Sequence, residues 1–505
     1  MCAKDCLDSI DQGTPLALGL QEVATSTGLR GVPTATTLWK IQAKPQEACC
    51  NHRLGGGGSK TLDTRDAPMR LRRPPRETLG PIAGLPGRHG ASLPSARQVT
   101  ALLRVLLRHP NPEPDAQQWR SLAQALTRGD PLADAVARWM KDAGLAHSMP
   151  MLEAALARGV DQVPAAPEVL KRFFAQVDTP PHWLDVNLLA RGAQASNLAG
   201  LAGTDIMRDL ALMAGYQSSA INRTLVLTGA LSRGAQRRLA ETTKWWVDCT
   251  TPGGMARFAP GFQGTVRVRL MHALVRQRVQ HLPEWDAGWL GVPINQQDMQ
   301  ATYLGFCVVY LTGLRFLGVW LRRDEVHALM HLWRYIGWLM GVEDELLFDD
   351  FTQAQVGLYR NLLAQPAPDD SSRALGAALM NEPLHTPYGH RWTWLNGLRG
   401  RYERARHLSI SRLFLTNPSM RSLGLPGHVL PWYPAMRLPW NLLVHETARR
   451  LPGGLDWLQG HGQRQQQDHL ATMFGRQTAR LGSVDEAGGM PVIPPRQAEP
   501  RKRTG

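Results

Sequence analysis

The sequence is short of cysteine for its length, with six cysteines in 505 residues. Four of them precede residue 51, and their spacing matches no common zinc-binding pattern. The other two, Cys249 and Cys307, lie among apolar residues in helical sequence, so we expect small buried side chains. This usage argues against a disulfide-rich secreted scaffold and favours a reducing compartment.

Long apolar segments are also absent. Residues 1–30 lack the apolar core of a secretory signal peptide. The most apolar stretch, residues 299–321, is interrupted by Arg315, and its uncharged part, residues 299–314, falls short of the roughly 20 residues that a membrane span needs. We therefore expect a buried core helix there and a cytoplasmic protein, with peripheral membrane contact left open.

Common catalytic and nucleic-acid-binding motifs are missing as well. The chain has no Gly-x-Ser-x-Gly elbow, phosphate-binding loop or dinucleotide glycine fingerprint in a strand–helix context. Its formal net charge is +15, but the arginines are scattered along the chain and dense only at 69–76 and 500–503. We expect no nucleic-acid partner, because no nucleic-acid-binding module accompanies this charge. Sixteen tryptophans instead suggest large apolar surfaces or pockets.

Three regions differ in pattern. Residues 1–97 have no sustained periodicity and contain a run of four glycines, so they are predicted to be disordered or linker-like, with Met69 as a candidate initiator. Residues 98–480 show helical periodicity bounded by Gly, Pro, Asn or Thr, without persistent strand-like alternation. Residues 481–505 are predicted to be a disordered basic tail. The predicted fold class is therefore all-α, a multi-helix globular domain.

One histidine lies on an apolar helix face in the segment RVRLMHALVR, residues 267–276. His272 shares this face with valines three and four residues away. Such an imidazole can coordinate iron or zinc, or it can donate a hydrogen bond inside a core, and spacing alone favours the core histidine. Arg269 and Arg276 flank it. A haem needs an apolar slot, an axial imidazole and cations for its propionates, and this helix offers all three residue types.

The preceding helix carries a second polar cluster. Arg238 and Thr242 are four residues apart and share a face, with Glu241 beside them. A hydroxyl and a guanidinium next to an apolar wall could orient dioxygen or a polar substrate group. The alternative is an ordinary amphipathic helix with an Arg238–Glu241 ion pair, worth roughly a few tenths of a kcal/mol. Residue spacing leaves both interpretations open.

Four segments together resemble a known family. They are RRLAETTKWWVD (237–248), VRVRLMHALVR (266–276), DMQATYLGFCVVYLTGLRFLG (298–318) and WRYIGWLMGVEDELL (333–347). In this order they resemble the catalytic domain of the rubber oxygenase family, which includes latex clearing protein and the fungal endoplasmic-reticulum-bound oxygenase MpaB. The resemblance covers about residues 180–350 and continues more weakly to about residue 445.

The resemblance implies an all-helical fold that encloses a b-type haem between helices. By its motifs, His272 would be the proximal iron ligand, and Arg238 and Thr242 would lie close to the haem. Dioxygen would be the co-substrate, and the substrate would be an apolar alkene of isoprenoid or lipid character. Some latex clearing proteins have a lysine just before the threonine. This chain has Glu241 there, which replaces a sixth iron ligand by a candidate general base.

We therefore expect a haem b-dependent oxygenase, with Arg269 and Arg276 as partners of the propionates. A non-catalytic helical protein that carries or senses haem or lipid is the alternative. A metal-free helical interaction protein is a third interpretation. The sequence indicates neither the oligomeric state nor one particular substrate.

Overall fold

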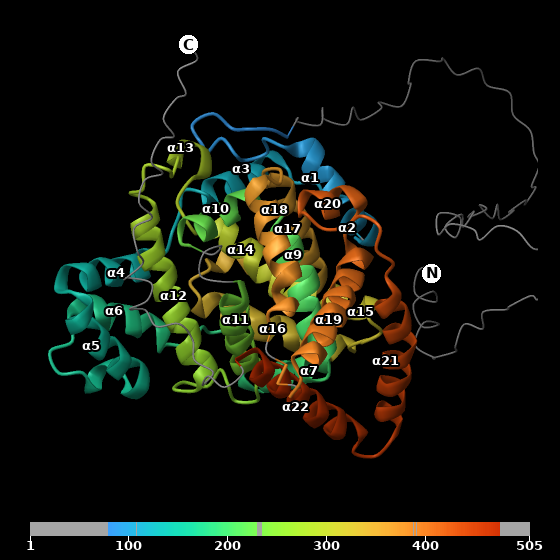
Figure 1. Ribbon diagram of the computed structural model, residues 1–505. Coiled ribbons are helices and arrows are strands. Elements are labelled where there is room, and N and C mark those ends of the chain that lie inside the picture. The colour runs from blue at the N-terminus through green and yellow to red at the C-terminus, as the bar shows by residue number, and fades with distance from the viewer. Residues whose placement is uncertain (1–78, 108, 230–234, 387, 390, 475–505) are drawn as a thin grey trace, which may run out of the picture. The chain divides into compact units, whose positions relative to one another are not determined.

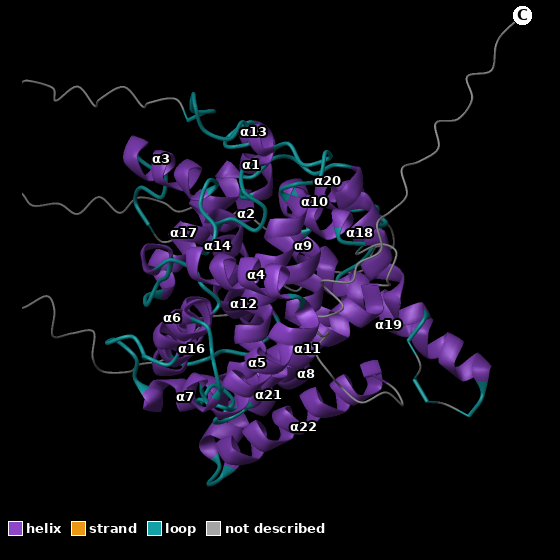
Figure 2. Cartoon of the chain, turned by 90° about the vertical axis from the view of Figure 1, so that its left-hand side faces the viewer, coloured by secondary structure: helices purple, strands orange, loops and turns teal. Residues whose placement is uncertain are grey.

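The computed structural model describes residues 79–107, 109–229, 235–386, 388–389 and 391–474 of the chain. Within these residues the chain forms helices joined by turns and loops without any strand, which confirms the predicted all-α class (Figure 2). The predicted tail at 481–505 and most of the predicted N-terminal extension, Met69 included, lie outside the described residues.

The first half of the described chain contains α1 (Leu93–Val99), α2 (Ala101–Leu106), α3 (Ala116–Ala125), α4 (Pro131–Ala143), α5 (Leu145–Arg158), η1 (Val160–Gln162), α6 (Glu168–Val177), α7 (Val186–Asn197), α8 (Gly200–Ile206), η2 (Met207–Leu212), α9 (Met213–Gly215), α10 (Ser219–Leu227), α11 (Ala235–Thr250) and α12 (Pro260–Val279). The second half contains α13 (Ala287–Leu290), α14 (Gln296–Leu304), η3 (Gly305–Val309), α15 (Tyr310–Phe316), α16 (Arg323–Leu339), η4 (Asp344–Leu346), α17 (Phe351–Ala364), α18 (Asp370–Asn381), η5 (Glu382–Leu384), α19 (Thr393–Phe414), α20 (Asn417–Ser422), α21 (Trp432–Arg450) and α22 (Gly454–Phe474).

Helix α4 shows how local sequence sets these boundaries. The Asp130 side chain accepts a hydrogen bond from the backbone N–H of Ala133, and Pro131 occupies the first helical position. Both are standard signals for a helix start. Gly144 follows the last turn with a φ of 81°, a conformation that favours glycine. These signals account for both ends of α4, within the stretch for which the sequence predicted helices.

Helices α7, α11, α12 and α16 pack around one continuous hydrophobic core near the middle of Figure 1. Helix α7 lies along α16 with the most extensive contact of any helix pair in the described chain. Gly192 makes this approach feasible, because a Cβ there would lie 2.4 Å from the carbonyl oxygen of Ala328. The pair forms a rigid frame against which α11 and α12 are held.

Two long helices are each interrupted by a π-helical segment. η2 joins α8 to α9, and η3 joins α14 to α15. The two π segments pack against one another. A π segment adds a residue to the turn and displaces the side chains around it, and such segments occur frequently at functional sites. The contact between η2 and η3 therefore marks one region of the core as a candidate functional site.

The apolar stretch at 299–321 is buried, as predicted. It forms most of α14, all of η3 and α15, and the turn that follows, with Leu304, Cys307 and Leu314 fully buried. Burial raises the pKa of the Cys307 thiol to about 12, so this cysteine is an inert core residue. Among the described residues, no helix is both long and apolar enough to cross a membrane.

The predicted start of the helical domain, at residue 98, is too late. Residues 79–97 already pack on the helices: the backbone N–H groups of Gly87 and Arg88 donate to the carbonyl oxygens of Gly288 and Trp289. The Arg88 side chain is buried and pairs with Asp298 at 2.7 Å. A segment rich in Pro and Gly has little periodicity, so its docking on distant residues leaves no signal in the local pattern.

Two ion pairs join α12 to α4. Arg269 forms a bidentate ion pair with Asp130, with Nε–Oδ2 and Nη2–Oδ1 distances of 2.6 and 3.1 Å. One α4 turn further along, Arg276 pairs with Asp134. Both arginine side chains are only 3% exposed. Burial of a charge is costly unless a partner neutralises it, so the two pairs fix the register of α12 against α4.

We predict that Asp130→Asn lowers the free energy of unfolding by about 3–5 kcal/mol, because Arg269 loses its buried counter-charge. Asparagine still caps α4, so the loss is not a capping effect. Chemical denaturation measures the change. Glu168→Ala is the matched control, since its i,i+4 pair with Arg172 is exposed at both ends and is worth at most about 0.5 kcal/mol. A loss below about 1 kcal/mol in the Asp130 variant would show that this pair does not hold the helices together.

Candidate functional site

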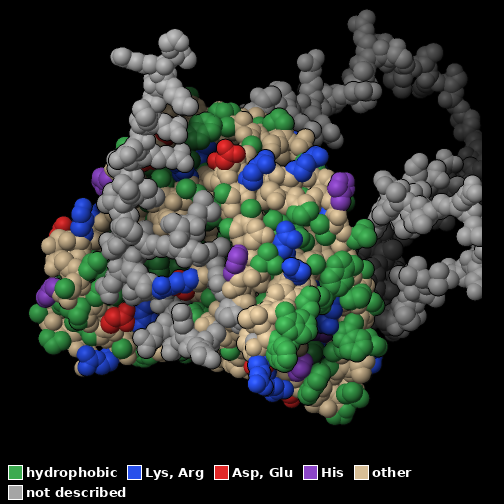
Figure 3. Space-filling model, viewed as in Figure 1, with side chains coloured by type: hydrophobic (Ala, Val, Ile, Leu, Met, Phe, Trp, Pro, Cys, Tyr) green, Lys and Arg blue, Asp and Glu red, His purple; other side chains and the backbone are tan. Residues whose placement is uncertain are grey.

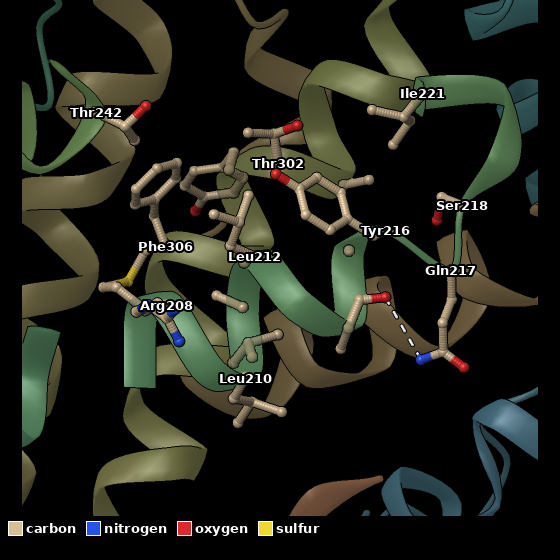
Figure 4. Close-up of a pocket in the computed structure, with 18 of the residues that line it drawn as sticks. Arg208, Leu210, Leu212, Tyr216, Gln217, Ser218, Ile221, Thr242, Thr302 and Phe306 are labelled. Carbon is tan, nitrogen blue, oxygen red and sulfur yellow. Dashed lines mark hydrogen bonds between the residues drawn. The ribbon is translucent and has the colours of Figure 1, made fainter. Parts of the chain in front are cut away.

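A large cavity of about 1300 Å³ lies between α11, α12 and the two π segments. It exceeds the roughly 300–1,000 Å³ typical of small-molecule pockets. In Figure 4, Thr242 of α11 lies on one side of the view and Tyr216, Gln217 and Ser218 lie on the other. Both π segments contribute wall residues, among them Leu210 and Phe306. The cavity therefore occupies the region that the π segments single out.

The wall is mostly aromatic and aliphatic. Phe306 stacks on Trp333 with ring centroids 4.8 Å apart, and Trp245 meets Phe306 edge-on at 5.2 Å. The Trp245 indole donates to the Thr265 hydroxyl at 3.0 Å, whereas the Trp333 indole nitrogen is buried without a partner among the described residues. Such a surface suits a large flat or elongated apolar ligand.

His272 borders this cavity from α12. Its Nδ1 is buried and makes no hydrogen bond with any described residue. Burial, followed by the charge of Arg276, lowers the pKa of His272 to about 4. The imidazole is therefore neutral at physiological pH. A neutral imidazole is the form that coordinates a metal.

All three polar residues predicted on α11 border the same cavity: Arg238, Glu241 and Thr242. Arg238 and Thr242 are exposed side chains, and Glu241 is partly buried. Glu241 pairs with Arg237, at 2.9 Å, in an i,i+4 contact. An ordinary helical ion pair is thus present, but its arginine is Arg237, whereas the sequence suggested Arg238. The pair holds the Glu241 carboxylate at the edge of the cavity.

Arg269 and Arg276 do not border the cavity. Their guanidinium groups are occupied by Asp130 and Asp134 and by backbone carbonyls, as described above. This geometry gives no support to their predicted role at the propionates. The cationic side chains that the cavity does have are Arg208, Arg237, Arg238, Arg267 and Arg412.

A second histidine in the wall, His469 of α22, was not predicted. Burial lowers its pKa, so it too is neutral near pH 7. It lies 197 positions after His272, in a polar helical segment without an apolar face around it. No local pattern distinguishes it from a solvent-facing histidine, and only the packing of α22 against α8 and α11 brings it to the cavity.

Arg208, which lines the cavity, belongs to a buried network of charged side chains. The sequence did not predict Arg208 or this network. Arg208 Nη1 donates to Asp209 at 2.6 Å, and Nη2 donates to the Leu379 carbonyl at 2.6 Å and to Glu382 at 3.2 Å. Burial raises the pKa of Asp209 to about 6, and the Arg208 charge opposes this rise. The network ties η2 to α18 and η5 at the point where η2 lines the cavity.

His407 completes this network from α19. Its Nδ1 lies 2.6 Å from Asp209 Oδ2, and Arg406 Nη2 lies 3.3 Å from its Nε2. Nδ1 must donate to the carboxylate, and Nε2 must accept from the guanidinium, so the ring is neutral. Burial likewise holds the pKa of His407 well below its usual value. Asp205, Asp209 and His407 are close enough to share a metal ion, but arginines already neutralise both carboxylates.

Comparison with known proteins places this arrangement in a family. Residues 200–450 match the family described as "ER-bound oxygenase mpaB/B'/Rubber oxygenase, catalytic domain". A rubber oxygenase from Streptomyces sp. (strain K30) is 25% identical over 232 residues, which are 45% of this chain and 52% of that protein. The match thus spans about half the length of this relative.

The fold also matches a solved structure. The closed state of latex clearing protein LCP superposes with a TM-score of 0.52 at 19% sequence identity, over 71% of this chain and 94% of that chain. The predicted resemblance over 180–350, weaker to 445, falls within nearly the same stretch as the matched domain. The chain therefore belongs to the family of ER-bound oxygenase mpaB/B' and rubber oxygenase catalytic domains.

Proposed function

We propose that this protein is a haem b-dependent oxygenase that uses dioxygen on an apolar alkene of isoprenoid or lipid character. One observation carries the proposal: the neutral His272 imidazole, whose Nδ1 makes no hydrogen bond with any described residue, borders a large aromatic cavity. Buried ring nitrogens are usually hydrogen-bonded. His89 and His445 also have buried nitrogens without a described partner, but neither borders the cavity, so it is the position of His272 in the cavity wall that sets it apart. Family membership agrees with this assignment.

The residues present fit a haem. His272 would hold the iron, and the aromatic and aliphatic wall would enclose the macrocycle. Cations that border the cavity are available for the propionates. Arg267, for example, pairs with the half-buried Glu153 at 2.6 Å and could share its charge with a second carboxylate. When bound, the haem would supply the one-electron and dioxygen chemistry that protein side chains lack.

The chain's own residues would bind and orient the reactants. Trp245, Phe306 and Trp333 exclude water and present an apolar surface to an alkene. The Thr242 hydroxyl and the Arg238 guanidinium can donate hydrogen bonds into the cavity and orient an oxygen-bearing group. Glu241 can accept a proton that the reaction releases, with Arg237 holding its carboxylate at the cavity edge.

A non-catalytic carrier of haem or lipid remains the second candidate, because it requires the same cavity and the same ligand. It makes no use of a proton acceptor at the cavity edge, where Glu241 lies. Turnover therefore separates the two functions.

We predict that His272→Ala abolishes the Soret absorption of the purified or haem-reconstituted protein, because it removes the iron ligand. His469→Ala is the matched control, since it removes the other neutral histidine from the same cavity. Absorption spectra of both variants, with circular dichroism as a check of folding, make the test. Loss of the Soret band in the His469 variant alone would overturn the ligand assignment.

The lowered pKa of His272 predicts the pH range of haem binding. A proton competes with iron for the imidazole, and here the imidazole is half protonated only near pH 4. Haem binding should stay constant from pH 8 down to about 5.5 and weaken toward about pH 4. An imidazole with an ordinary pKa of about 6.5 would begin to release iron two units earlier. A spectrophotometric titration that gives a midpoint near 6.5, with unchanged circular dichroism, would contradict the proposed environment.

We predict that Glu241→Gln lowers turnover roughly 100-fold or more without loss of haem absorption, because the proton acceptor is lost. Oxygen consumption and carbonyl products are measured with squalene and with a polyisoprene emulsion. Glu168→Gln is the control, since it alters a glutamate in an equivalent i,i+4 pair on the surface. Full activity of the Glu241 variant would remove this residue from the chemistry. A wild-type protein that binds haem but consumes no oxygen with either alkene would favour the carrier.

A further inference from the structure

Exposed apolar side chains are concentrated in one part of the chain. Eighteen large hydrophobic side chains are exposed among the described residues, and twelve of them lie between residues 384 and 457. In Figure 3 hydrophobic side chains gather at the lower right, where Figure 1 places α21 beside α19. A contiguous exposed apolar surface of this kind marks a site of interaction with another protein, a ligand or a membrane.

Helix α21 has the reverse of the usual amphipathic pattern. Its polar residues face inward: the Asn441 side chain donates to the Leu317 carbonyl at 2.8 Å, and Arg449 forms two hydrogen bonds with Glu325 at 2.8 and 2.7 Å. Its apolar residues Trp440 and Leu443 face outward and are 56% and 62% exposed. A surface helix normally buries its apolar face, so the outer face of α21 lacks a partner within the described chain.

Helix α19 continues the same surface. Trp394, Leu398 and Tyr402 follow one another at intervals of four residues and are all exposed, so they form one stripe. The ring of Tyr402 lies 6.2 Å from that of Trp432, at the start of α21, and the two helices pack together. The surface formed by Trp394, Leu398, Tyr402, Met436, Trp440 and Leu443 is called the α19–α21 surface below.

The charge around this surface has one sign. Residues 385–450 contain ten arginines, no lysine and no aspartate, and their two glutamates both pair with arginines. Arg399 and Arg401 of α19 and Arg450 of α21 are exposed. A second copy of the chain would bring these arginines face to face, which is unfavourable. An anionic lipid surface would instead attract them.

We infer that the α19–α21 surface binds the protein peripherally to an anionic phospholipid membrane. Outward tryptophan, leucine and methionine side chains would enter the boundary between headgroups and acyl chains, and the arginines would contact phosphates. Tryptophan and tyrosine favour this depth because each combines an apolar ring with a polar atom. The C-terminal end of α19, residues 412–415, borders the cavity. Access of a lipid-dissolved substrate through this end rests on the proposed function, whereas the binding itself does not.

Co-sedimentation of the full-length chain with vesicles tests this inference. We expect the protein to pellet with vesicles of equal parts phosphatidylcholine and phosphatidylglycerol, and less so as salt rises. Trp440→Glu combined with Leu443→Glu should lower the bound fraction roughly tenfold or more, because charge cannot enter the acyl boundary. Trp289→Glu combined with Val186→Glu is the matched control: it makes the same chemical change at exposed positions outside the α19–α21 surface. The control should leave the bound fraction within about twofold of wild type.

Three results would overturn the inference. Wild-type protein that stays in the supernatant with the anionic vesicles would do so, as would equal loss of binding in both double variants with unchanged circular dichroism. The third is a surface variant that halves the particle mass in light scattering while it leaves vesicle binding unchanged, which would make a second copy of the chain the partner. The test contains neither haem nor substrate, so its failure leaves the proposed function untouched, and His272→Ala should bind vesicles like wild type.

Discussion

The two buried ion pairs between α12 and α4 determine where His272 lies. Arg269 and Arg276 are seven residues apart on one stripe of α12. Arg269 pairs with Asp130, the N-cap of α4, and Arg276 pairs with Asp134, one turn further along α4. A helix held at two points along its length can neither slide nor rotate without unpairing a buried charge. His272 lies between the two arginines in sequence, so the same constraint presents its ring to the cavity. The arginines that the sequence suggested as partners of propionates instead hold His272 in position.

The cavity depends on a second set of buried charges. The π segment η2 forms part of its wall, and Arg208 and Asp209 connect that segment to α18, η5 and α19 through paired charges and a neutral histidine. Apolar packing alone would tend to collapse a space of this size. The frame of α7 and α16 on one side and the charged network on the other keep the walls apart. Rigid walls of this kind leave the site preorganised for a large ligand.

The local sequence pattern predicted those features that depend only on residues close to one another in the chain. The all-helical pattern, the buried stretch at 299–321 and the apolar face around His272 follow from periodicity, and each is present. Partners across the fold could not be predicted this way. Whether Arg269 meets a propionate or an aspartate depends on where α4 packs, 139 residues earlier in the chain. The position of His469 depends in the same way on the packing of α22.

The sequence of α21 does not show which of its faces is buried. Its residues include apolar and polar positions at helical spacing, and the pattern does not tell which face turns inward. The contacts of Asn441 and Arg449 decide it, and they leave tryptophan and leucine outside. An aromatic cavity and an apolar outer surface thus occur on one molecule, joined by α19. Both features suit a protein that works on molecules dissolved in lipid.

We propose that His272 holds a haem iron in this cavity. Anomalous diffraction at the iron edge, from crystals of the haem-loaded protein, tests it most directly. We expect one strong iron peak inside the cavity, within bonding reach of the His272 imidazole. An iron peak bonded to His469, or located outside the cavity, would contradict it.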